Sequence, residues 1–451
     1  MISAWLDYFK TGPDKPLLDD KGQIRRLYER KRWSVVISLV IGYGFFYFCR
    51  LSLSVTKGPM VEAGVMSVTE LGIVGGALMY VYAFGKCVNG FLADRANIRR
   101  FMSFALLASA VVNLLFGFSN HFYVFLALWF LNGWLQSIGS APSVVSLCQW
   151  FSNNERGTRY AIWAGAHNIG EGLTFVVASA FVSWWGWRAG FIGPGLACLV
   201  VGLILLRTLA DRPQTYGLPD VAAYRNDFPT AVTVAPTAAE LWRLQRSVLT
   251  SPKIWILGMA SALMYACRYG VYSWGPFYLQ QVKGYSIMES GSMIGLAGIL
   301  PGLIGATLSG FVSDRFFKAR RNIPCLFYGL VLIGALSLLY LAPPGNKHLD
   351  FTAICAFEFS IGGLIVFLAG LMAVDYFPRA VTGAVKGVLG LFSYLAAGSQ
   401  YWIGGLLIDH SVTVVEGAKV YNFKPIFLFW LGCAVVSAVL PLFLWNAKPH
   451  E

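Results

Sequence analysis

The stretch Gly90-Phe-Leu-Ala-Asp-Arg95, followed by an arginine pair at 99 and 100, recurs as Gly310-Phe-Val-Ser-Asp-Arg315, with a second pair at 320 and 321. Two further pairs of positions share nearly this offset. Tyr-Phe-Cys-Arg at 47–50 corresponds to Tyr-Ala-Cys-Arg at 265–268, and His167 corresponds to Lys386. Three matches at one spacing indicate that a single unit is present twice in the chain. The fold is therefore expected to consist of two similar halves.

The composition decides what surrounds these halves. Of 451 residues, 57% are hydrophobic and 13% are charged, whereas an average soluble domain has about 45–50% apolar and 25% charged residues. The chain is therefore expected to be a polytopic membrane protein in contact with the lipid bilayer. Its net charge of +13 does not indicate nucleic acid, because the basic residues cluster at the ends of apolar runs. The first 32 residues lack the pattern of a cleavable signal.

Twelve apolar runs reach the length of about 20 residues that a spanning helix needs. They are expected at 33–57, 68–93, 101–118, 122–149, 159–186, 189–209, 254–281, 289–313, 323–343, 350–375, 382–408 and 424–446. The prediction is an all-α protein of twelve transmembrane helices in two pseudo-symmetric six-helix halves. The predicted parts are an N-terminal segment 1–32, a first half 33–209, a linker 210–252, a second half 253–446 and a tail 447–451.

The basic residues also predict which side of the membrane each end occupies. The termini and the loops on their side hold 25 of the 35 Lys and Arg residues, and the opposite loops hold six. Lysine and arginine are enriched in cytoplasmic loops. Both termini and the linker are therefore expected in the cytoplasm.

Several charged residues fall inside the apolar runs, where each costs at least about 2.5–3.5 kcal/mol and marks a functional site by default. The basic ones are Arg50, Lys86, Arg268 and Lys386, and the acidic ones are Glu171 and Glu358. The excess of positive charge predicts an anion as the ligand. Equivalent arginines in the two halves suit phosphate, which accepts paired hydrogen bonds from guanidinium groups. Carboxylate ligands, or pairing of the arginines with the two glutamates, remain open.

Other residues of the predicted site are less charged. His167 changes its charge near neutral pH in its ordinary state, and it is also a candidate for simple packing. Trp163 and Asn168 lie on the same polar helix segment. Hydroxyl groups for the cavity are predicted from Tyr43, Tyr47, Tyr82, Tyr265 and Tyr394, each of which is equally a candidate for packing.

The repeated Gly-x-x-x-Asp-Arg loop resembles the loop between helices two and three of the major facilitator superfamily. In both repeats the glycine permits close approach of two helix ends, and the charged pair is expected to hold these ends in one of two states. The predicted gating residues are Asp94, Arg95, Asp314 and Arg315.

Further stretches carry a narrower resemblance. They are Gly-Tyr at 42–43, Tyr-Phe-Cys-Arg at 47–50, Tyr-Ala-Phe-Gly-Lys at 82–86, Glu-Arg-Gly at 155–157, and the segments 163–170, 211–219, 265–270 and 390–395. Over nearly its whole length the chain resembles the organophosphate:phosphate antiporter family of that superfamily, and most of all its hexose-phosphate transporter and sensor branch. By this resemblance Arg50 and Arg268 bind the phosphoryl group, His167 and Lys86 assist, and the five tyrosines line the site.

The resemblance implies an antiporter that exchanges an organic phosphate, such as glucose 6-phosphate, for inorganic phosphate in a bacterial inner membrane. Three alternatives remain. One is a hexose-phosphate sensor that signals to a membrane kinase. Another carries phosphoglycerates or phosphoenolpyruvate, with Lys386 pairing with the carboxylate. The last is a cation-coupled symporter. No enzyme motif, metal-ligand spacing or cofactor motif is present in the sequence.

Overall fold

The computed structural model describes residues 7–227, 238–317, 320–378 and 381–445. The predicted tail 447–451, residue 446 of the last predicted run, residues 1–6 of the N-terminal segment and residues 228–237 of the linker lie outside the described residues.

The first half is built from seven helical segments. They are α2 (Lys21–Glu62), α3 (Val68–Ala93), α4 (Ile98–Phe118), α5 (Phe122–Gln136), α6 (Ser140–Trp150), α7 (Asn153–Trp185) and α8 (Ala189–Thr208). The helix α2 begins at Lys21, well before the predicted apolar run, because hydropathy detects only its apolar part. The side chain of Asp20 caps this helix by accepting a hydrogen bond of 2.7 Å from the backbone N–H of Gly22.

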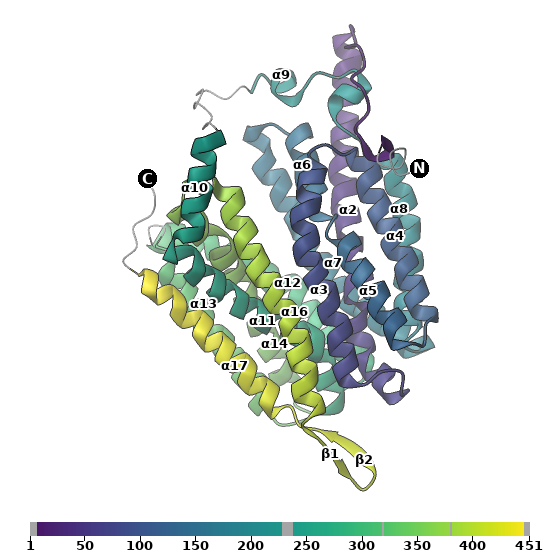
Figure 1. Cartoon of the computed structure of the whole chain (residues 1–451), viewed down its shortest axis with the longest axis vertical. Coiled ribbons are helices and arrows are strands. Elements are labelled where there is room, and N and C mark those ends of the chain that lie inside the picture. The colour runs from purple at the N-terminus through teal and green to yellow at the C-terminus, as the bar shows by residue number, and fades with distance from the viewer. Residues whose placement is uncertain (1–6, 228–237, 318–319, 379–380, 446–451) are drawn as a thin grey trace.

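The connecting segment and the second half follow. The connection holds η1 (Pro213–Tyr216), α9 (Val221–Arg225) and α10 (Ala238–Thr250). The second half contains α11 (Pro252–Gln281), α12 (Ile287–Phe317), α13 (Asn322–Leu341), α14 (Lys347–Val366), the π-helical turn η2 (Phe367–Leu371), α15 (Met372–Tyr376), α16 (Thr382–Asp409), α17 (Lys424–Val439) and η4 (Leu440–Leu444). Between α16 and α17 a hairpin of β1 (Val412–Val415) and β2 (Ala418–Tyr421) projects from the bundle (Figure 1).

Ten helical stretches of the described residues are long and apolar enough to cross a membrane, with α5 and α6 forming one stretch and α14 and η2 another. The helices α7 and α16 complete the twelve, but their composition is too polar to meet that criterion. These two helices also carry His167, Glu171 and Lys386, which explains their polarity. The prediction of twelve helices in two six-helix halves is confirmed.

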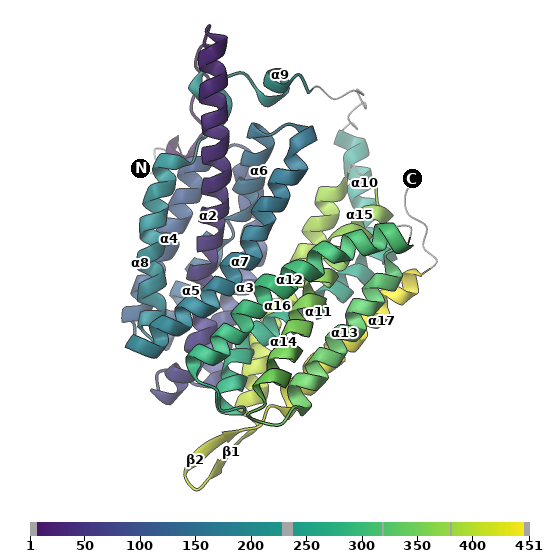
Figure 2. The ribbon, with the colours of Figure 1, turned by 180° about the vertical axis from the view of Figure 1, so that it is seen from behind.

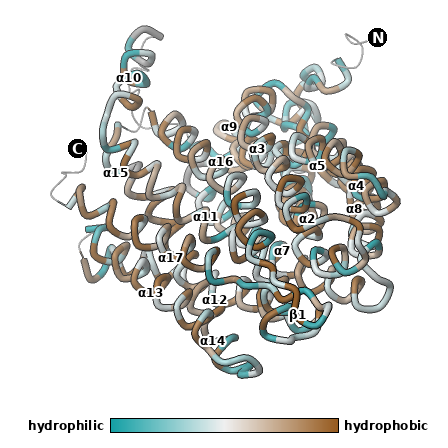
Figure 3. Tube along the Cα trace, turned by 60° about the horizontal axis from the view of Figure 1, so that its bottom comes forward, coloured by the Kyte–Doolittle hydropathy of each residue, from teal (hydrophilic) through white to brown (hydrophobic). Residues whose placement is uncertain are grey.

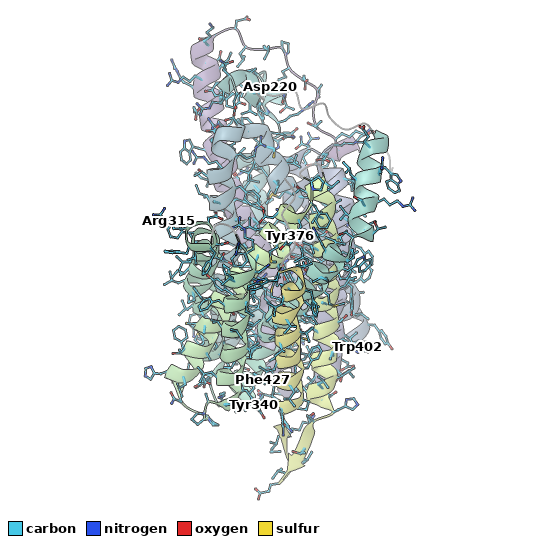
Figure 4. All side chains as sticks on the ribbon, turned by 90° about the vertical axis from the view of Figure 1, so that its left-hand side faces the viewer. Asp220, Arg315, Tyr340, Tyr376, Trp402 and Phe427 are labelled. Carbon is cyan, nitrogen blue, oxygen red and sulfur yellow. The ribbon has the colours of Figure 1, made fainter. Side chains whose placement is uncertain are left out.

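The outer surface of the bundle fits a lipid environment. In Figure 3 the helices are coloured mainly as hydrophobic residues, and many large apolar side chains, such as Phe91, Tyr123 and Phe311, are exposed. So much exposed apolar surface is unfavourable in water. Figure 4 shows the bundle from the side, with Arg315 at its edge. Tyr340 and Phe427 lie towards the hairpin in this view, and their ring centroids are 5.1 Å apart.

The two halves pack against each other at the end of the bundle that carries the hairpin, which we call the hairpin end. Here α3 packs on α16, and α7 packs on α12. A Cβ atom on Gly295 would lie 2.4 Å from the carbonyl oxygen of Gly172, so the α7–α12 contact requires glycine. A hydrogen bond of 2.5 Å from Thr69 to Asp409 and one of 2.9 Å between Tyr80 and Ser399 also join the halves.

The opposite end, where α2 begins, we call the terminal end, and Figure 2 shows the two halves diverging towards it. Among the described residues, the ion pairs of the helical bundle at this end join residues of one half. Arg32 of α2 pairs with Glu155 of α7, and Arg321 lies 3.0 Å from Asp375. The structure is therefore closed between the halves at the hairpin end and held within each half at the terminal end.

Candidate functional site

A polar cluster, which we call the central cluster, lies midway along the bundle and begins with three residues from two helices. Arg50 and Tyr47 belong to α2, and His167 belongs to α7. The guanidinium carbon of Arg50 lies 4.2 Å from the centroid of the Tyr47 ring. The hydroxyl of Tyr47 shares a hydrogen bond with Nδ1 of His167. The first half therefore presents arginine, tyrosine and histidine as one connected group.

Arg268 of α11 joins this group from the second half. Its Nη2 atom lies 3.0 Å from Nε2 of His167 and donates a hydrogen bond of 2.6 Å to Oε2 of Glu171. Because guanidinium can only donate, Nε2 of His167 must accept, and the Nδ1–H of a neutral imidazole then donates to Tyr47. Tyr47 and His167 thus link Arg50 of the first half to Arg268 of the second.

The two arginines differ in their charge partners. Arg268 forms a buried ion pair with Glu171, each side chain being 3% exposed, as one of the alternatives from the sequence anticipated. Arg50 is 6% exposed, has no carboxylate partner among the described residues, and its Nε and Nη2 atoms lack hydrogen-bond partners. Burial of an unpaired charge is costly. Arg50 is therefore the side chain of the central cluster that most requires an anion.

Aromatic rings surround these cations. Tyr82 of α3 lies with its ring 5.3 Å from the Arg50 guanidinium carbon, and its ring is 4.7 Å from that of Tyr394 on α16. Nζ of Lys86 is 5.1 Å from the centroid of the Tyr394 ring. The ring of Tyr265 on α11 is 5.6 Å from Tyr394. Residues from both halves therefore enclose the cluster.

The remaining predicted residues of the substrate site lie at different distances from this cluster. Tyr43 lies 3.5 Å from Tyr47, hydroxyl to hydroxyl, and its ring is 4.7 Å from that of Trp163. Asn168 is half-buried on α7 and makes no side-chain hydrogen bond with the cluster among the described residues. Lys386 is exposed near the start of α16 and likewise makes no hydrogen bond or ion pair with it. The structure therefore brings Tyr43 and Trp163 to the cluster, but not Asn168 or Lys386.

The predicted gating residues lie at the C-terminal ends of α3 and α12, which are at the terminal end of the bundle. Asp314 forms an ion pair with Arg321, the last residue of the repeated motif, within the second half. Asp94, Arg95 and Arg315 are exposed, and no ion pair of theirs is present among the described residues. In this conformation Arg321 makes the motif's charge contacts, and a gating role for the four residues stays a prediction.

Sequence reasoning missed a further buried cation, Lys57 of α2, which was counted as a residue of an external loop. Its side chain is fully buried, donates a hydrogen bond to Ser273 of α11, and lies with Nζ 3.4 Å from the Trp274 ring centroid and 5.0 Å from that of Tyr401. Residues seven positions apart lie on one face of a helix. The spacing of Lys57 from Arg50 was therefore a usable signal. This lysine joins the two halves at the hairpin end.

Comparison with known proteins assigns the fold to a family. The model of the Major Facilitator Superfamily matches residues 39–400. The chain belongs to the Major Facilitator Superfamily. The structure of a bacterial homologue of the human lysosomal transporter Spinster, in an inward-facing and unoccupied conformation, superposes with a TM-score of 0.73 at 17% identity, over 92% of this chain and 97% of that one.

Relatives within the superfamily extend over the whole chain. It is 33% identical to the membrane sensor protein UhpC of Salmonella typhimurium, over 99% of both chains. It is 32% identical to the glycerol-3-phosphate transporter of Bacillus subtilis, over 98% of both chains, and 28% identical to a probable hexose phosphate transport protein of Chlamydia pneumoniae, over 99% and 98%. The predicted membership of the organophosphate:phosphate antiporter family, close to its hexose-phosphate transporter and sensor branch, is confirmed.

These relatives also establish the broad class of the protein. It is a multi-pass membrane protein of a transporter family, and not an enzyme. Two of these relatives are named as transporters of phosphorylated compounds, one for glycerol 3-phosphate and the other for hexose phosphate.

Proposed function

We propose that the protein is an antiporter that exchanges an organic phosphate, a hexose phosphate such as glucose 6-phosphate, for inorganic phosphate by alternating access. The observation that carries this proposal is the buried guanidinium of Arg50, which has no carboxylate partner among the described residues. The other buried arginine of the cluster, Arg268, is paired with Glu171. Phosphate has several acceptor oxygens and takes paired hydrogen bonds from planar guanidinium groups. It fits the donors of Arg50 that have no partner.

The charge of the central cluster supports exchange rather than one-way transport. Arg50, Lys86 and Arg268 carry three positive charges, and among the described residues Glu171 is the one carboxylate in ion-pair contact with any of them. An anion in the cluster relieves the repulsion between these cations. Ligand binding can drive closure of the halves only if the ligand binds the closed state better than the open one. If the halves close over the cluster only when its charge is balanced by an anion, the empty carrier does not reorient, and transport is limited to exchange.

We place the terminal end on the cytoplasmic side of a bacterial inner membrane, because most lysine and arginine residues outside the apolar runs lie at this end. The hairpin-end contacts of α7 with α12 then make the described conformation one that faces inward. Rocking of the halves about the central cluster would expose it to the other side, as in transporters built from repeats.

Exchange in proteoliposomes tests the proposal. Vesicles loaded with inorganic phosphate should take up labelled phosphate, and glucose 6-phosphate should inhibit this uptake more strongly than phosphoglycerate. Arg50→Lys should lower exchange by roughly 100-fold, because an ammonium cannot make both bonds of the planar fork and loses about one charge-assisted hydrogen bond, which contributes about 1.5–3 kcal/mol. Arg207→Lys, the same change at an exposed position, is the matched control. Near-normal exchange by Arg50→Lys would overturn the proposal.

A sensor is the second candidate function, because a relative at 33% identity is named as a membrane sensor protein. The site of a sensor for hexose phosphate can be identical to that of a carrier. Binding of glucose 6-phosphate by the purified protein, without exchange in proteoliposomes, would favour the sensor. A membrane kinase would then be the partner to seek.

A further inference from the structure

Glu358 of α14 is a buried carboxyl group that the proposed exchange does not use. Its side chain is 2% exposed, and the hydroxyl of Tyr272 donates a hydrogen bond of 2.7 Å to its Oε2 atom. Its Oε1 atom has no hydrogen-bond partner, and no cation pairs with it among the described residues. An ionised carboxylate in such surroundings is costly, and a buried group without a partner tends to be neutral.

The helix that packs most closely on α14 supplies no partner. On α12 the positions next to the carboxyl group are Gly298 and Gly302, where an added Cβ atom would lie 3.9 Å from Oε2 of Glu358. The charged residues of α12, namely Glu289, Asp314 and Arg315, lie near its two ends. The carboxyl group therefore faces two positions of α12 that have no side chain.

The titratable and charged groups that lie towards Glu358 from the other neighbouring elements come from α11, α7, α13 and α14 itself. On α11 they are Tyr272 and Arg268, whose guanidinium carbon is 5.2 Å from the Tyr272 ring centroid. Glu171 of α7 holds Arg268, and His167 contacts the same guanidinium. On α13 the hydroxyl of Tyr328 bonds to the Gly305 carbonyl, and on α14 itself Cys355 lies one turn earlier. Among these described groups the cation is Arg268, which is paired with Glu171 and forms no ion pair with Glu358.

We propose that Glu358 is a proton-binding site, and that the proton it binds accompanies a doubly charged phosphate substrate through the carrier. This inference rests on the proposed function. With Glu358 protonated, the three cations and Glu171 give the central cluster two net positive charges; with Glu358 ionised, they give one. Protonation thus matches the cluster to a phosphate dianion, and ionisation matches it to a monoanion. The proton is taken from water on the side where substrate binds and returned to water on the other side, with no other bond formed or broken.

Substrate binding should therefore draw a proton onto the protein, since a nearby negative charge favours the neutral form of a carboxyl group. The measurement is calorimetric titration of the purified full-length protein with glucose 6-phosphate, and separately with glycerol 3-phosphate, at a series of pH values from about 8 to 10 in buffers of different ionisation enthalpy. A phosphate monoester, with a second pKa of about 6, is fully dianionic throughout this range. Proton uptake by the wild type should rise towards one proton for each bound ligand once the pH is high enough to ionise Glu358 in the unliganded protein.

Glu358→Gln keeps an acceptor for Tyr272 but cannot ionise, and it should bind the ligand with no proton uptake. Glu289→Gln, the same change at a half-buried site near the start of α12, should keep the uptake of the wild type. Should Glu358→Gln fail to fold, Tyr272→Phe remains informative. Loss of its hydrogen bond should move the pH range of proton uptake upwards, because that bond stabilises the ionised carboxylate.

The outcomes separate this inference from the proposed function. Binding of either ligand without proton uptake by the wild type would overturn the role of Glu358 and leave phosphate exchange standing. Unchanged uptake in Glu358→Gln would do the same. Failure of both ligands to bind the wild type would overturn the proposed function and, with it, this inference.

Discussion

The buried lysine at the hairpin end gives a quantitative prediction about alternating access. Lys57 of the first half donates to the hydroxyl of Ser273 in the second half, and both side chains are fully buried. Ser273→Ala removes this hydroxyl without changing the size of the helix contact. A hydrogen bond to a charged group contributes about 1.5–3 kcal/mol. The bond exists only while the halves touch at the hairpin end, so its loss should favour separation there by about 10- to 150-fold.

A cysteine at Ser179 would report this separation. Ser179 is fully buried between α7 and α12, and its hydroxyl has no hydrogen-bond partner among the described residues. In Ser179→Cys, the rate of alkylation by a membrane-impermeant maleimide added outside should follow the population that is open at the hairpin end. The variant that combines Ser179→Cys with Ser273→Ala should react about 10 times faster or more. Protein without the Ser179→Cys change accounts for reaction of the native cysteines.

Ser261→Ala is the matched control on the same helix. Its hydroxyl is fully buried and bonds over 2.8 Å to Ser393 within the second half, so its loss should leave the alkylation rate unchanged. In a Lys57→Met background, Ser273→Ala should have no further effect, because its charged partner is absent. Equal rates for Ser273→Ala and Ser261→Ala would refute the reasoning.

Three further outcomes are expected. Gly295→Ala should abolish exchange but retain phosphate binding in an equilibrium assay, because its Cβ would lie 2.4 Å from the facing carbonyl on α7. Gly334→Ala, whose Cβ would have nothing within 4 Å, is the control and should exchange normally. Normal exchange by both variants would contradict the need for glycine at position 295. Lys386→Ala should leave the order of competitors unchanged, because Lys386 is exposed and outside the cluster; selective loss of inhibition by phosphoglycerate would restore its role as a carboxylate partner. Burial raises the pKa of Glu155, but its hydrogen bond with Arg32 and the charge of that residue lower it more, so the pKa lies below its ordinary value. The stability that this ion pair contributes is then complete above the ordinary pKa of a glutamate and is lost as the pH falls through the lowered pKa of Glu155. Glu155→Gln should therefore flatten the acidic part of a profile of melting temperature against pH. An unchanged profile would argue against a stabilising role of the pair.

The fold followed from the sequence because its determinants are local. Apolar length predicted each spanning helix, and the repeated motifs predicted two halves. The criterion was weakest for α7 and α16, where polar residues interrupt the apolar run. The start of α2 was also missed, since its first turns extend beyond the apolar part that hydropathy detects.

The candidate site was predicted in part. The sequence indicated which helices carry charge at membrane depth, and the structure brings Arg50, Arg268, His167 and Lys86 near one another with their tyrosines. The identity of the charge partners was not predictable. Whether Glu171 meets Arg50 or Arg268, and whether Lys386 reaches the cluster, depends on how helices distant in the chain are rotated and packed.

The sequence by itself determined a twelve-helix membrane protein of two similar halves with an excess of positive charge within its helices, because hydropathy, charge and internal repetition are properties of composition and order. Only the tertiary structure decided that Arg268 is paired and Arg50 is not, that Lys57 joins the halves, and that Glu358 lacks a cation. The physical reason is that the cost of a buried charge depends on the atoms within a few ångströms of it. Those atoms come from helices that only packing brings together.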